Sequence, residues 1–156
     1  MKNVAYQCIK GYLDKHNLRY NEDNDSKSAF YLTFETKDFP IQNKISVMEK
    51  PNLLSLYSYF DFEVEEEKRV ETLMGISMIN FELSSGCFDF DLNTGHIIFR
   101  IQTCYPKSGQ VEDEFIDYLL MLTNHIVDYF NDKLFFLISG KSSLEDFYQQ
   151  VKAFGK

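Results

Sequence analysis

Three runs of alternating apolar residues follow one another in the first half of the chain, with short connections between them. The runs are SAFYLTFET at 28–36, KISVMEK at 44–50 and LLSLYSYFDFEV at 53–64. Alternation with a period of two is typical of strands that bury one face. Strands joined by short loops pair antiparallel, because a parallel neighbour needs a long crossover. The pattern therefore predicts an antiparallel meander, with Pro51 and Asn52 in its second turn.

Helical spacing of apolar residues surrounds this meander. The spacing predicts helices at 3–16, 65–85, 110–138 and 142–154. Gly140 ends the third helix, Ser142-x-x-Glu145 resembles a capping box for the fourth, and 21–28 is an acidic loop. Two further strands surround Asn93-Thr94-Gly95. We therefore expect a single α+β domain over 1–156, with an antiparallel sheet of about five strands packed with helices in the order α-β-β-β-α-β-β-α-α.

Charge and composition narrow the classes of function. The formal net charge of −8 repels nucleic acid and anionic membrane surfaces, and no basic stripe offsets it. The N-terminal sequence MKNVAYQCIKGYLDKHN lacks the apolar region of a signal peptide, and no window of about 18 apolar residues predicts a membrane span. Three scattered cysteines without a CxxC pair indicate reduced thiols. We expect a cytoplasmic protein that binds neither nucleic acid nor membrane.

The stretch CFDFDLNTGHIIFR at 87–100 superficially resembles a calcium loop. An EF-hand loop needs glycine at position 6 and a bidentate glutamate at position 12. Counting from Asp89, the glycine, Gly95, falls one place late, and position 12 is the cation Arg100. Strand alternation explains the stretch instead, with Phe88, Phe90 and Leu92 inward and Asp89 and Asp91 outward. The sequence therefore predicts a β-hairpin, without a metal or another cofactor.

Other catalytic and nucleotide-binding patterns are incomplete. SGKSS at 139–143 lacks the earlier glycine of a P-loop, since Phe135 stands there. No HExxH or GxSxG motif occurs. Two alternatives stay open: an enzyme whose site assembles Cys104, His96 and nearby carboxylates, and a small-molecule sensor with a pocket between sheet and helices.

The second faces of the predicted strands are unusually apolar. A sheet covered by helices on one side only is expected to carry polar residues on the other. Here that side carries Tyr31, Met48, Leu53, Tyr57, Tyr59 and Ile98. Tyrosine and methionine are enriched at protein interfaces. The final helix, a second copy or a protein segment could cover this face, and our candidate partner surface is Tyr31, Met48, Tyr57, Tyr59 and Ile98.

The second half of the chain resembles the YbjN-domain family of bacterial proteins. The similarity lies in an Asn-containing helix end, a glycine before an F-x-hydrophobic-D strand, a glycine hairpin and a hydrophobic-x-Arg strand. In this chain those features are Asn80, Gly86, Phe88 to Asp91, Gly95 and Phe99-Arg100.

The resemblance implies a fold like that of type III secretion chaperones and a role in bacterial sensory transduction. It supplies no catalytic residues. We therefore expect a non-enzymatic, chaperone- or adaptor-like module that binds other proteins. Chaperones of that fold pair through their middle helix, so the resemblance also implies a homodimer through Val70, Leu73, Met74, Ser77 and Phe81.

Overall fold

One antiparallel sheet organises the computed structural model, which describes residues 3–23, 25 and 28–154. Its strands are β1 (Asn21–Glu22), β2 (Ala29–Phe34), β3 (Ile41–Glu49), β4 (Asn52–Glu63), β5 (Cys87–Phe90) and β6 (His96–Cys104). They lie in the order β1-β2-β3-β4-β6-β5. The helices are α1 (Val4–Lys15), α2 (Arg69–Glu82), α3 (Asp113–Ile138) and α4 (Leu144–Ala153), and the 3-10 turn η1 (Glu66–Lys68) precedes α2. The predicted α+β class and element order are confirmed, apart from one strand.

The sixth strand, β1, is the element that the sequence did not predict. It has two residues, which pair with Tyr31 and Phe30 of β2. So short a strand has no alternation to detect, and it lies inside the stretch 21–28 that was expected to be an acidic loop. Residues 24, 26 and 27 of that expected loop lie outside the described residues.

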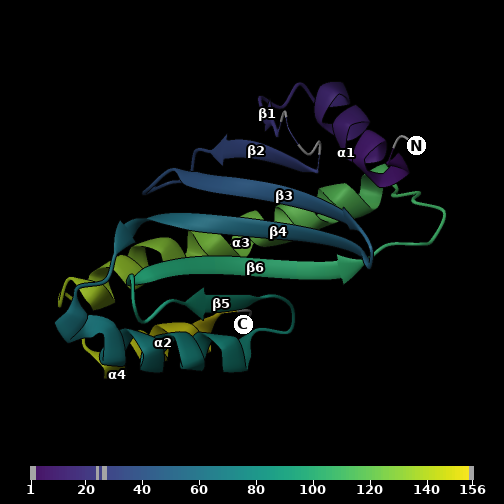
Figure 1. The fold of residues 1–156 in the computed structure, drawn as a ribbon. Coiled ribbons are helices and arrows are strands. Elements are labelled where there is room, and N and C mark those ends of the chain that lie inside the picture. Colours follow the sequence, from purple (N-terminus) through teal and green to yellow (C-terminus); the bar gives the residue numbers. More distant parts are fainter. Residues whose placement is uncertain (1–2, 24, 26–27, 155–156) are drawn as a thin grey trace.

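The helices cover one face of the sheet and leave the other bare (Figure 1). In Figure 1 the long α3 runs behind the strands, α1 lies at the β1 end, and α2 and α4 lie at the β5 end. Cross-strand register aligns the inner residues into rows, one of which is Phe30, Ile45, Leu56 and Ile101. All four are buried against the helices. Burying each such side chain contributes roughly 1.5–3 kcal/mol, so this face forms the core.

The C-terminal helix α4 does not cover the second face of the sheet. It packs against α2 and α3, with Phe147 and Val151 fully buried. α4 approaches α2 closely, because a Cβ added at Gly75 on α2 would lie 3.1 Å from Phe147 Cε1 on α4. The helix is capped one residue later than predicted: Ser143 Oγ, not Ser142, accepts a hydrogen bond from the Asp146 amide. The outward side of the sheet therefore remains exposed in the single chain.

The predicted hairpin forms around Gly95, but it is shorter than the alternation indicated. β5 ends at Phe90, so Leu92 lies in the turn with 49% of its surface exposed rather than facing the core. Gly95 has a φ of 80°, and a Cβ there would lie 2.4 Å from the Val64 carbonyl oxygen. Arg69 Nη1 donates to the carbonyls of Leu92 and Asn93 at 2.9 and 3.0 Å. These contacts tie the turn to the start of α2.

Candidate functional site

The exposed face of the sheet, here called the open face, carries the residues that were predicted from the sequence to form a partner surface. Register places Tyr31, Met48, Tyr57, Tyr59 and Ile98 on this face, together with Leu53. Among them Tyr31, Met48 and Tyr59 are exposed, by 42, 47 and 38%. Leu53, Tyr57 and Ile98 are half-buried by their neighbours. The alternation on β2, β3, β4 and β6 is what brings these six side chains together.

A polar network crosses the same face on β4, β5 and β6. Arg100 Nε donates to Asp89 Oδ2 at 2.6 Å, and Arg100 Nη1 donates to Gln102 Oε1 at 2.6 Å. Gln102 Nε2 in turn donates to Ser55 Oγ at 3.0 Å and to the Tyr57 hydroxyl at 3.3 Å. The hydrogen bond from Arg100 lowers the pKa of Asp89, so the pair stays ionised at neutral pH. Alternation alone did not indicate this network, which fixes the side chains of the β6 half.

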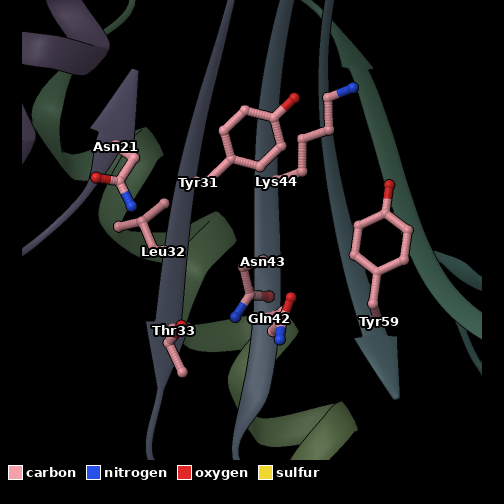
Figure 2. A pocket seen from close by; sticks show the side chains of 8 residues that line it. All are labelled: Asn21, Tyr31, Leu32, Thr33, Gln42, Asn43, Lys44 and Tyr59. Carbon is pink, nitrogen blue, oxygen red and sulfur yellow. The ribbon is translucent and has the colours of Figure 1, made fainter. Parts of the chain in front are cut away.

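The β2–β3 half of the open face contains a shallow hollow of about 520 Å³. Figure 2 shows the side chains that line it, with the rings of Tyr31 and Tyr59 on either side of β3. Its lining residues are Asn21, Tyr31, Leu32, Thr33, Gln42, Asn43, Lys44 and Tyr59. Only one of these side chains is charged, and it is a lysine.

Cross-strand register places Lys44 between two tyrosines. Its β2 partner is Tyr31 and its β4 partner is Tyr57, while Gln42 lies opposite Tyr59. Lys44 Nζ lies 5.7 Å from the centroid of the Tyr31 ring, within cation–π range. Burial raises the pKa of Tyr59, and the nearby ammonium of Lys44 opposes that shift. The hollow therefore offers one ammonium, two aromatic walls and hydroxyl and amide hydrogen-bonding groups.

Sequence reasoning did not select the polar members of this hollow as candidates. They are Asn21, Thr33, Gln42, Asn43 and Lys44. Gln42 was missed because β3 begins at Ile41, before the predicted start at 44. Lys44 shares the parity of Met48 on the same strand, so alternation could have placed it on the open face. Asn21 joins the site through β1, which carries no sequence signal.

The outward face of α2 is a second exposed apolar surface, and it consists of the residues proposed for a dimer. The exposed fractions of Val70, Leu73, Met74 and Phe81 are 69, 41, 50 and 87%, and Ser77 is exposed between them. The opposite side of α2 packs inward through a separate set of residues: Thr72, Gly75, Ile76 and Ile79. Nothing within the described chain covers the outward face.

The geometry rules out the Cys104–His96 site. These residues are the last and first of β6, about 27 Å apart along an extended strand. His96 Nε2 instead lies 3.5 Å from Glu63 Oε1. Among the described residues no group of three or more His, Cys, Asp or Glu side chains could hold a metal ion. The interior between sheet and helices is filled by aromatic side chains such as Phe30, Phe99 and Phe130.

The features that carried the family resemblance have structural roles. Asn80, near the end of α2, donates through Nδ2 to the Phe88 carbonyl at 2.9 Å and accepts from the Phe88 amide at 2.7 Å. Its side chain thereby pairs with the edge strand β5 as a neighbouring strand would. A Cβ on Gly86 would lie 2.4 Å from Phe99. The asparagine and the glycine thus hold β5 between α2 and β6.

Together these features define a class: an α+β domain with a one-sided antiparallel sheet and a long helix behind it. The sequence model of one protein family, described as "Putative bacterial sensory transduction regulator", matches residues 6–136. The chain therefore belongs to the YbjN family, as its sequence predicted.

A solved structure agrees with this assignment at the level of the fold. The crystal structure of YbjN from E. coli, described as "a putative transcription regulator", is similar with a TM-score of 0.63 and 13% sequence identity. The match covers 81% of this chain and 87% of that one. No curated protein matches the sequence. Within the described residues, no helix is long and apolar enough to cross a membrane.

Proposed function

We propose that the chain is a non-enzymatic, chaperone- or adaptor-like module that binds a segment of another protein on its open face. One observation carries the proposal: α4 packs away from the sheet and leaves Tyr31, Met48 and Tyr59 exposed together. Tyr31 and Tyr59 lie on either side of β3, and Met48 lies further along the same face. Exposed aromatic and methionine side chains are typical of interface cores. Membership of a family described as "Putative bacterial sensory transduction regulator" supports a regulatory setting for this binding.

The proposal includes a homodimer that forms through α2. Val70, Met74 and Phe81 are exposed along one side of the helix, at intervals that return to the same face. A second copy can place the same stripe against it around a two-fold axis, which is the commonest symmetry of soluble oligomers. The α2 stripe lies at the β5 end of the molecule, so pairing there leaves the β2–β3 half of the open face accessible (Figure 1).

A cytoplasmic location completes the proposal. Cys8, Cys87 and Cys104 are all free thiols, which is usual in a reducing compartment. The segment that binds the open face would then belong to a cytoplasmic partner.

Site-specific photo-crosslinking in the native cell tests the binding surface. A photo-reactive phenylalanine analogue replaces Tyr59 on the open face or, as the matched control, Tyr118, which is exposed on α3. We expect a discrete protein adduct from position 59 that the control lacks, and we expect Tyr31→Asp in the same chain to remove it. Identical adduct patterns from both positions, or none from position 59, would contradict the proposal.

A further inference from the structure

The hollow on the open face carries a positive charge, although the molecule as a whole is negatively charged. The chain carries a net charge of −8, yet the hollow's single charged side chain is Lys44. Lys44 forms no ion pair with any described residue; its ammonium lies over the Tyr31 ring and near Tyr59. The exposed carboxylate of Asp61 lies on the neighbouring strand β4, two residues after Tyr59, and Asp89 on β5 is bonded to Arg100; neither forms an ion pair with Lys44. An anion is therefore the complement of this hollow.

A carboxylate fits the hollow better than a phosphate. A phosphate group is usually held by arginine forks or several cations, and the hollow offers one lysine with neutral amides and hydroxyls. A single carboxylate balances one ammonium, and its remaining lone pairs can accept from Gln42 or from a tyrosine hydroxyl. The rings of Tyr31 and Tyr59 provide apolar walls for the atoms that carry the carboxylate.

The edge of β2 beside the hollow is open. The Asp23 amide donates to the Ala29 carbonyl, so the backbone groups of alternate residues, including Thr33, point toward the β1 side. β1 begins only at Asn21, opposite Tyr31, and no strand of the described chain lies beside Thr33. Figure 2 shows β1 alongside the upper part of β2 only. An unpaired strand edge is a template for an extended segment from another chain.

From these two observations we infer that the hollow binds an extended, acidic segment of the partner protein, with the segment's main chain on the free edge of β2 at Thr33 and a glutamate or aspartate side chain on Lys44. The inference rests on the proposed function and specifies the chemistry of its partner. The strand edge selects the extended backbone, and Lys44 selects the carboxylate.

A defined peptide tests the inference directly on the full chain. The probe is the blocked hexapeptide acetyl-TVEVTY-amide, titrated against the isotope-labelled protein, with amide shifts followed by NMR. We expect shifts at Leu32, Thr33 and Lys44, and binding about threefold to tenfold weaker when the peptide glutamate is replaced by glutamine. In Lys44→Gln the two peptides should bind equally, while Lys44→Arg should restore the preference. Lys107→Gln, an exposed lysine outside the hollow, is the control and should keep it.

Several results would overturn the inference. One is the absence of shifts at these residues up to roughly 5 mM peptide, a concentration that largely fills a site with a Kd of about 1 mM. Another is equal binding of the glutamate and glutamine peptides to the unmodified chain. Acetylglutamate amide binding as tightly as the peptide would make the ligand a small carboxylate. In each case, a crosslink from position 59 that survives Lys44→Gln would leave the proposed function standing.

Discussion

At the scale of single residues, Asn80 shows how one side chain closes a sheet edge. Its amide supplies both a donor and an acceptor to Phe88, the pair of bonds that a further strand would make. The edge of β5 is thereby unavailable for pairing with another chain. Among the described residues no side chain closes the edge of β2 beside Thr33 in this way, so that edge, unlike the edge of β5, can still pair with another chain.

Replacing Asn80 should therefore reduce the stability of the fold more than is usual for a partly exposed residue. Asn80→Ala removes both bonds and leaves the Phe88 amide and carbonyl without partners, so we expect a loss of about 1–3 kcal/mol in the free energy of unfolding. Urea denaturation measures the change. Asn93→Ala, in the exposed hairpin turn, is the control and should stay within about 0.5 kcal/mol. Equal effects of the two substitutions would refute the structural role of Asn80.

Two glycines allow an opposite pair of predictions. Gly95→Ala forces a side chain into a left-handed conformation and against the Val64 carbonyl, so it should destabilise the fold by roughly 2 kcal/mol or more. Gly11 lies inside α1, and nothing is within 4 Å of an added Cβ, so Gly11→Ala should stabilise by about 0.5–1 kcal/mol. Thermal unfolding should show midpoints moving in opposite directions. If both substitutions move the unfolding midpoint in the same direction, the local structure described for these two glycines is wrong.

At the scale of elements, the outward stripe of α2 carries the prediction of a dimer. Met74→Glu places a charge in the proposed interface, so the dimer should dissociate while the monomer stays folded. Met121→Glu is the matched control, because Met121 is at least as exposed as Met74 (65% against 50%) but lies on α3. Sedimentation velocity at roughly tens of micromolar protein distinguishes the two species. A monomeric unmodified chain, or the same behaviour in both variants, would argue against the α2 interface.

Elements with several periods of hydrophobic pattern were predictable from the sequence. The long alternation at 53–64 predicted β4, and the helical spacing at 110–138 predicted α3. Gly140 follows the end of α3 with a φ of 72°. β1 was not predictable, because two residues hold no periodicity and their pairing is decided by β2. The cap of α4 moved by one residue since Ser142 and Ser143 are both good N-cap residues.

The candidate site was predictable only in its apolar half. Alternation placed Tyr31, Met48 and Tyr59 on one face, but the hollow depends on which residues face each other across strands. Register is set by the whole sheet, so the position of Lys44 between Tyr31 and Tyr57 needed the structure. The bond between Asp89 and Arg100 likewise joins residues from two strands of a hairpin, and the sequence indicated only that Asp89 faces outward.

At the scale of the whole molecule, the parts that bury the core are separate from the surfaces that are proposed to bind other chains. α1 and α3 cover the inner face of the sheet, and α4 packs against α2 and α3 at the β5 end (Figure 1). The outer surface of α2 and the open face are left for other chains. We therefore propose that a second copy pairs at the α2 end of the molecule and that a regulatory partner binds the sheet.

The most direct test of the central claim is the affinity of the crosslinked partner for the purified chain, measured by calorimetry. Tyr59→Asp should weaken binding at least about tenfold, because it removes an aromatic contact and repels an acidic segment. Tyr118→Asp, an equivalent change on the exposed side of α3, should leave the affinity within about twofold. Loss of binding in Tyr118→Asp, with Tyr59→Asp binding as the unmodified chain does, would show that the partner binds the helical side and that the open face is not the docking surface.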